Sequence, residues 1–136
     1  ETYKQKMQKY AQLNCIKNVI FTGHIKFSEI LACYKAADLF LCMSEHEGFC
    51  VPLVEAMYFQ IPVIAYNSSA IGETLGKGGI LLNEKNALET AALMDRVLKD
   101  KELQKKIIAN QNERLADFAH DKILARFNEL LKENVL

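Results

Sequence analysis

Two glutamates on either side of a glycine turn are the residues of this sequence best suited to chemistry. Glu47 and Glu55 lie in the segment 44–56, with Gly48 directly after the first of them. A carboxylate can accept two hydroxyl hydrogen bonds at once, so each glutamate suits a vicinal diol of a ribose or a hexose. Gly48 has no side chain and lets the backbone approach a ligand closely. Together they predict a binding turn for a sugar-containing ligand.

The residues around this turn predict a strand before it and a helix after it. Positions 39–43 form a continuous apolar run, which is typical of a parallel strand buried on both faces. Pro52 is suited to the first turn of a helix that reaches about residue 59. Backbone N–H groups at a helix start are unsatisfied, and the helix dipole favours negative charge there. The junction is therefore also suited to a diphosphate.

Strand and helix patterns alternate along most of the chain. Three more strands are expected at 19–23, 62–66 and 79–82. Helices are expected at 3–14, at 28–37 with Ser28 as its cap, between Asn86 and about residue 98, and beyond residue 103. Alternating strands and helices predict an α/β fold with a Rossmann-like parallel sheet and flanking helices. In such sheets ligands bind at the carboxyl ends of the strands, where the candidate turn is expected to lie.

Composition excludes several classes of protein. The 136 residues, half of them hydrophobic and a quarter charged, are those of one ordinary globular domain. Lys plus Arg equals Asp plus Glu at 17 each, so no basic excess points to nucleic acid. The four cysteines include no C-x-x-C pair, which argues against a zinc site. Nothing in their spacing indicates a disulfide framework, so a reducing compartment is expected. Cys33 and Cys42 are expected to be thiols buried in the core. No apolar run approaches the ~20 residues of a membrane span.

Each of these features also has a purely structural explanation. A strand–glycine–helix junction occurs in every doubly wound sheet, and the helix dipole alone favours a glutamate in the first turn. His46 is best explained as a surface-loop histidine, and Cys50 as a nucleophile would need a neighbouring base to form its thiolate. Ser68 and Ser69 fit either a ligand site or a plain turn. Pattern alone therefore favours a structural explanation for the junction.

The segment 44–56 resembles the signature of the retaining glycosyltransferases of family four, which have the GT-B fold. That signature is an acidic residue, seven further residues and a second glutamate, and Glu47 and Glu55 match it. The flanking segments 34–41, 62–65 and 71–73 resemble the same family, so the similarity runs in register from about Val19 to Leu82. This combination is far more specific than a single glycine motif.

The resemblance implies a role for each site residue. Glu47 would contact hydroxyls of the donor sugar as the catalytic residue, and Glu55 would hold the ribose hydroxyls of the nucleotide. Most members of the family need no bound metal, so none is expected here, and the donor would be a nucleotide diphosphate sugar. The remaining contacts to the donor would come from backbone groups around the sugar and diphosphate and from two residues near the base: Gly48, Phe49, Cys50, Val51, Gly23 and His24.

Two positions depart from the family pattern. Cys50 stands where a second glycine is commonest, and Gln60 stands where a glycine usually precedes the Ile-Pro step. A side chain at Cys50 is expected to narrow the donor pocket or alter the sugar preference. Gln60 is expected to affect only a turn.

The resemblance also implies what the whole protein does. Residues 1–136 would be a C-terminal donor-binding domain, incomplete at its N-terminal side and without its first two strands. The whole enzyme would transfer a hexose to a saccharide or lipid-linked acceptor held by an N-terminal domain, in polysaccharide or glycolipid biosynthesis, and this stretch alone would be inactive. The expected location is the cytoplasm or the inner face of the membrane, with peripheral membrane association left open. Two alternatives remain, a GT-B-fold nucleotide-sugar epimerase and a non-catalytic scaffold domain.

The final helix carries the clearest amphipathic stripe. In the family's architecture the terminal helix crosses back toward the N-terminal domain, so part of this stripe is expected to lie exposed or against another copy of the chain. The stripe comprises Ile123, Leu124, Phe127, Leu130 and Leu131.

Overall fold

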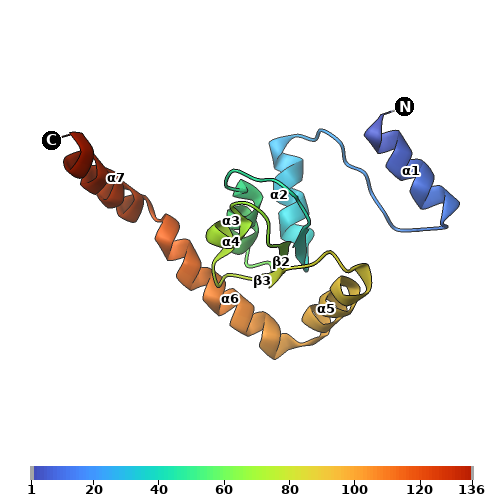
Figure 1. The fold of residues 1–136 in the computed structure, drawn as a ribbon. Coiled ribbons are helices and arrows are strands. Elements are labelled where there is room, and N and C mark those ends of the chain that lie inside the picture. The colour runs from blue at the N-terminus through green and yellow to red at the C-terminus, as the bar shows by residue number, and fades with distance from the viewer. Residues whose placement is uncertain (1, 136) are drawn as a thin grey trace. The chain divides into compact units, whose positions relative to one another are not determined.

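The computed structural model describes residues 2–135, and its contacts divide the chain into two compact units (Figure 1). Unit 1 is Glu1–Cys33 and unit 2 is Tyr34–Leu136. Unit 1 contains helix α1 (Tyr3–Leu13) and most of helix α2 (Phe27–Ala36). Thr2 begins α1 with a capping box, in which its hydroxyl accepts from the Gln5 amide while the Gln5 side chain accepts from the Thr2 amide.

The strand expected at 19–23 is absent, and this prediction is wrong. The segment has no regular structure, and Val19 and Ile20 are exposed. A strand persists only where a neighbour about 4.8 Å away completes its backbone hydrogen bonds, and no described strand pairs with this segment. The helix that follows begins at Phe27, so Ser28 lies inside its first turn and is not its cap. Cys33, expected in the core, is exposed.

Three of the four expected strands form one parallel sheet in unit 2. Strand β1 (Phe40–Cys42) pairs with β2 (Val63–Tyr66), and β2 pairs with β3 (Ile80–Leu82), in the order β1-β2-β3. The register places Ile64 of β2 opposite Leu41 on one side and Ile80 on the other. The apolar runs in the sequence therefore located these strands to within one or two residues.

Six helical segments complete unit 2. The helix expected at Pro52 is α3 (Val51–Tyr58), and a short helix, α4 (Ile71–Leu75), connects β2 to β3. Asn86 caps the next helix by accepting from the amides of Leu88 and Glu89, as its sequence position predicted. The helices of the last third are α5 (Ala87–Lys99), α6 (Lys101–Leu115), the 3₁₀ turn η1 (Ala116–Phe118) and α7 (His120–Val135).

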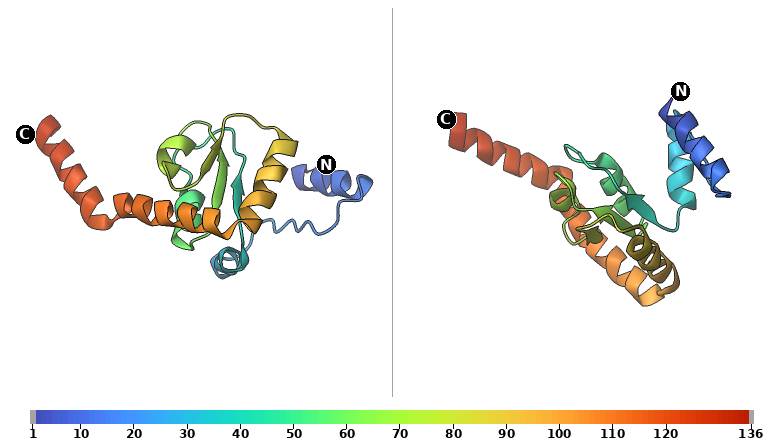
Figure 2. Two further views of the ribbon diagram at one scale, coloured as in Figure 1. Left: turned by 90° about the horizontal axis from the view of Figure 1, so that it is seen from below. Right: turned by 45° about the vertical axis from the view of Figure 1, so that its right-hand side comes forward.

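The sheet is buried on both faces because successive side chains of β2 point in opposite directions. Val63 and Ala65 pack into the cluster that includes α3 and α4, whereas Ile64 packs with Val97 of α5 and Ile107 of α6. Figure 2 shows α5 on the opposite side of the strands from α3 and α4. Helix α6 contributes to both clusters, with Leu103 near its start and Leu115 at its end. This helix therefore links the two faces of the sheet.

The stripe of α7 is exposed, as expected. The exposed fractions of its five residues run from 40% for Leu131 to 56% for Phe127. Across residues 2–135, no helix combines the length and the apolar character that a membrane crossing requires.

Candidate functional site

The candidate turn lies between the end of β1 and the start of α3, at the carboxyl edge of the sheet. Gly48 is exposed, and a Cβ built on it would meet nothing within 4 Å. Its backbone is therefore open to the approach of a ligand. Cys50 is the N-cap of α3, with no side-chain cap hydrogen bond, and Pro52 follows in the first turn. The geometry combines an exposed backbone with the N-terminus of an eight-residue helix.

Glu55 is the fifth residue of α3 and is partly buried. Glu55 therefore lies beyond the first turn of the helix. The helix dipole favours acidic residues only within the first turn, so the dipole does not explain a glutamate at this position. Its Oε2 accepts a hydrogen bond of 2.9 Å from the hydroxyl of Tyr34, whose ring stacks on Phe59. Burial, and then the hydrogen bond and charge of Glu55, raise the pKa of Tyr34 far above its usual value, so Tyr34 stays a proton donor to Glu55. No other described residue donates a hydrogen bond to the carboxylate of Glu55.

Glu47 is partly buried in the loop and, among the described residues, makes no hydrogen bond or ion pair. Its neighbour Glu45 is different, because Lys85 pairs with that carboxylate at 2.9 Å. A carboxylate held partly out of water without a partner is available to accept from ligand hydroxyls. The two glutamates of the motif thus flank the open Gly48, and each retains acceptor capacity.

Two serines of the β2–α4 connection hold the start of the loop. The hydroxyl of Ser68 donates to the carbonyl of Ser44 at 2.7 Å. Ser69 lies 3.5 Å from the carbonyl oxygen of Glu45 and 3.4 Å from Nδ1 of His46. The sequence did not distinguish whether Ser68 and Ser69 belong to a ligand site or to a plain turn. Their contacts with residues 44–46 show that they stabilise the start of the loop. His46 is exposed, as expected of a surface-loop histidine.

Cys50 points into the core. Its side chain is 6% exposed, and its sulfur lies 3.9 Å from that of Cys42. Burial, followed by the nearby Cys42 and the charge of Glu47, raises the pKa of Cys50 to about 11, so the thiol stays protonated and is a poor nucleophile. This placement runs against the expectation that its side chain narrows a donor pocket.

Both departures from the family's glycines have a left-handed backbone. Cys50 has φ 65° and Gln60 has φ 57°. Glycine reaches this region without steric cost, whereas other L-residues pay about 1–2 kcal/mol there. Both positions therefore have the backbone conformation that favours glycine, although neither residue is one.

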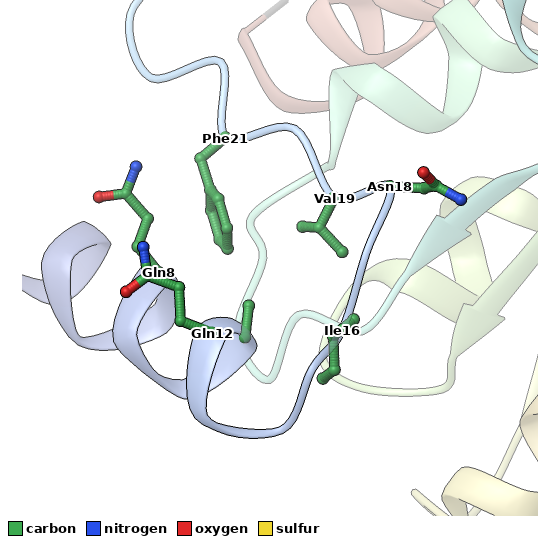
Figure 3. Close-up of a pocket in the computed structure, with 7 residues that line it drawn as sticks. Gln8, Gln12, Ile16, Asn18, Val19 and Phe21 are labelled. Atoms are coloured by element: carbon green, nitrogen blue, oxygen red, sulfur yellow. The ribbon is translucent and has the colours of Figure 1, made fainter.

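Gly23 and His24 belong to unit 1 and stay predictions. Gly23 has φ 65°, and His24 is exposed. A hollow of about 340 Å³ also lies in unit 1, between α1 and the segment that follows it (Figure 3). It offers amide groups but no charged side chain to a diphosphate. Its lining consists of Gln8, Ala11, Gln12, Ile16, Asn18, Val19 and Phe21.

Sequence reasoning missed three residues that shape the site. Tyr34 was read only as part of a flanking segment, and Thr74 and Arg114 were not singled out. Thr74 is 3% exposed and donates to the carbonyl of Phe49. No spacing rule connects positions 21 to 41 residues apart, so these contacts carried no signal in a single sequence.

Comparison with known proteins places the chain in one family. The model of the family "Glycosyl transferases group 1" matches residues 1–114. The serotype-specific mannosyltransferase WbdA of Escherichia coli is 27% identical over 101 residues, which are 74% of this chain and 12% of that protein. The chain thus spans about an eighth of the length of that relative.

Solved structures agree in fold. The C-terminal domain of a glycosyl transferase group 1 family protein (LpcC) from Francisella tularensis matches with a TM-score of 0.70 and 29% identity, over 84% of this chain and 60% of that one. Anabaena HepE, solved in complex with UDP and glucose, matches with a TM-score of 0.81 and 24% identity, over 96% of this chain and 36% of that one. The described fold is that of a C-terminal GT-B domain.

Proposed function

Because this chain belongs to the glycosyl transferases group 1 family, we propose that it is the nucleotide-sugar-binding part of a retaining, family-four enzyme that transfers a hexose. Transfer itself is proposed for the longer protein, since the chain corresponds to only 12% of its mannosyltransferase relative. The acceptor, a saccharide or a lipid-linked saccharide, would be held by residues outside this chain. This stretch alone would bind donor without completing the reaction.

Each carboxylate of the motif has its own role in this proposal. Glu55, oriented by Tyr34, accepts from the ribose hydroxyls, and Glu47 accepts from hydroxyls of the donor sugar. Backbone groups from Gly48 to Val51 line the sugar and the diphosphate, whose charge the N-terminus of α3 favours. Catalysis here is mainly positioning of the donor and stabilisation of the departing diphosphate.

One observation carries the proposal. The two glutamates lie on either side of a glycine on which a built Cβ would meet nothing within 4 Å, and one of them is already oriented by a partly buried tyrosine hydroxyl. A junction that served only to connect a strand to a helix would need neither an unpartnered, partly buried Glu47 nor an oriented Glu55. Both features suit a ligand rich in hydroxyl groups.

Isothermal titration of the full-length natural protein tests the proposal. UDP-glucose and GDP-mannose, each beside its bare nucleotide diphosphate, are titrated with and without EDTA. We expect one nucleotide family to bind, with the sugar adding affinity and EDTA having no effect. Binding of none of these ligands by a folded protein would instead favour a scaffold. Conversion of the sugar in the bound donor to its epimer would favour an epimerase.

A further inference from the structure

We propose that Thr74 and Arg114 are positioning residues that set the geometry of the segment Glu47–Phe49. This inference rests on the proposed function, since it concerns the sugar-facing part of the same site. Neither residue belongs to the motif: Thr74 lies in α4 and Arg114 at the end of α6. Together they join the exposed loop to the interior of unit 2.

Thr74 makes the first connection. Its hydroxyl donates to the carbonyl oxygen of Phe49 at 2.6 Å, and the residue is 3% exposed. Phe49 itself is 45% exposed, and Gly48 before it has open space around it. The single described hydrogen bond to this carbonyl therefore comes from the core side of the loop. It fixes the peptide plane between Phe49 and Cys50, which is the second plane after Gly48.

Arg114 fixes the helix that carries Thr74. Its guanidinium donates to the carbonyl oxygens of Thr74 at 3.1 Å and Glu73 at 2.6 Å. These carbonyls lie near the end of α4, where no further turn of helix can satisfy them. The remaining nitrogen of the guanidinium, Nη1, pairs with Oδ2 of Asp117 at 2.9 Å. This ion pair fixes the orientation of the guanidinium group. Lysine has the charge but not the planar fork that reaches three oxygens at once.

Arg114 also reaches Phe49 by a second path. The guanidinium lies over the ring of Phe118, 4.6 Å from its centre, and the ring of Phe49 meets that of Phe118 edge to face at 5.7 Å. The carbonyl of Phe49 is thus connected to Arg114 through hydrogen bonds of Thr74. The ring of Phe49 is connected to Arg114 through the ring of Phe118. Two independent connections from one residue restrict both translation and rotation of the loop segment.

This restriction matters because Glu47 has no partner of its own. The carboxylate can meet sugar hydroxyls in a productive geometry only if the loop backbone is already in place, and misplacement by about 1 Å can reduce the rate of a reaction on the order of a hundredfold. Glu55, by contrast, is held by Tyr34 on a regular helix. Loss of the connection to Phe49 should therefore weaken binding of the sugar part of the donor more than binding of the nucleotide part.

The test compares two buried threonines in the full-length natural protein. Thr74→Val removes the hydroxyl that holds Phe49, and Thr74→Ser keeps it. Thr90→Val is the matched control, because Thr90 is 7% exposed and donates to the carbonyl of Asn86 at 2.7 Å, within the start of α5. The readout is the ratio of the dissociation constants of the nucleotide-sugar and the bare nucleotide diphosphate, with UDP-glucose/UDP and GDP-mannose/GDP as probes. Amide exchange of residues 45–50 is measured in the same proteins.

We expect Thr74→Val to weaken the nucleotide-sugar on the order of tenfold, to leave the bare nucleotide within about twofold, and to speed exchange of residues 45–50. Thr74→Ser should restore both readouts, and Thr90→Val should change neither. Arg114→Lys should act in the same direction as Thr74→Val, and the two changes combined should cost less than the product of their separate effects, because both act through Phe49.

Two results would overturn the inference. One is an unchanged ratio and unchanged exchange in Thr74→Val; the other is an equal change in Thr74→Val and Thr90→Val, which indicates a general loss of structure. A wild-type protein that binds none of the probes overturns the proposed function. In that case the exchange measurement still decides whether Thr74 and Arg114 hold the loop.

Discussion

The hydroxyl of Tyr34 donates to Oε2 of Glu55 over 2.9 Å, linking the end of α2 to the middle of α3 across 21 positions of sequence. The tyrosine ring stacks on Phe59, nearly parallel, with centroids 5.4 Å apart. The stacking fixes the ring, the ring fixes the hydroxyl, and the hydroxyl selects one orientation of the carboxylate. Glu55 therefore meets a ligand with its orientation already set.

Tyr34→Phe separates orientation from packing. The variant keeps the ring stack and loses only the hydroxyl, so we expect donor affinity to fall several-fold, by about 1 kcal/mol for one hydrogen bond, while the fold persists. Glu55→Ala should cost more affinity, about 1.5–3 kcal/mol for a charged hydrogen bond, and some stability, because it leaves the Tyr34 hydroxyl without its partner. Titration calorimetry with the donor measures both. Unchanged affinity in Glu55→Ala would contradict the ribose assignment.

Glu47→Gln tests the sugar assignment. The amide keeps the shape of the side chain but removes the charge that strengthens hydrogen bonds to sugar hydroxyls. We expect lower turnover of the full-length enzyme and weaker binding of the nucleotide-sugar, with the bare nucleotide diphosphate bound as before. Glu45→Gln, which breaks only the exposed pair with Lys85, is the control. A parallel loss of bare-nucleotide affinity would show that the roles of Glu47 and Glu55 are exchanged.

Gly48 and Gly79 should respond to alanine in opposite ways. A methyl group on Gly48 meets nothing within 4 Å, so Gly48→Ala should fold as well as the wild type and weaken donor binding where the backbone approaches the ligand. A methyl group on Gly79 would lie 2.7 Å from the backbone oxygen of Val63, so Gly79→Ala should destabilise the sheet. Urea denaturation and donor titration on both variants check this. Loss of stability in Gly48→Ala would refute the open-backbone assignment.

The left-handed backbone of Cys50 makes a further prediction about stability. Cys50→Gly relieves about 1–2 kcal/mol of backbone cost and loses a similar amount of buried side-chain contact with Cys42, so the net change should stay within about 1 kcal/mol. Cys50→Val should destabilise clearly, because a β-branched residue is poorly tolerated at φ 65°. Cys42→Val, in a strand, is the matched control. Equal unfolding midpoints for Cys50→Val and Cys42→Val would show that φ is not the cause.

Stability should fall in alkaline solution because of the same thiol. Burial raises the pKa of Cys50 from 9.0 to about 11, so between these values the folded protein holds a proton that the unfolded chain has lost. The unfolded state then binds fewer protons, and the free energy of unfolding must decrease as the pH rises. The raised pKa of Tyr34 acts in the same direction at still higher pH. Denaturation of wild type and Cys50→Gly from pH 8 to 11 should show a shallower slope in the variant, and parallel slopes would rule out this cause.

The sequence by itself determined the features that depend on neighbours along the chain. Apolar runs located β1, β2 and β3, and Pro52 and Asn86 marked helix starts. The spacing of Glu47 and Glu55 around Gly48, together with the flanking segments, carried the resemblance to the glycosyltransferase family to which the chain belongs. These signals are local because hydrogen bonding within a helix, capping and the alternation of a strand involve residues a few positions apart.

Tertiary structure alone decided the rest. The segment 19–23 has the composition of a strand, but a strand also needs a neighbour, and none of the described strands supplies one. Which oxygen of Glu55 meets Tyr34, which way Cys50 points, and what holds the carbonyl of Phe49 all depend on contacts between residues 8 to 25 positions apart. Such contacts follow from the packing of whole elements against one another, and one sequence without its fold carries no local signal for them.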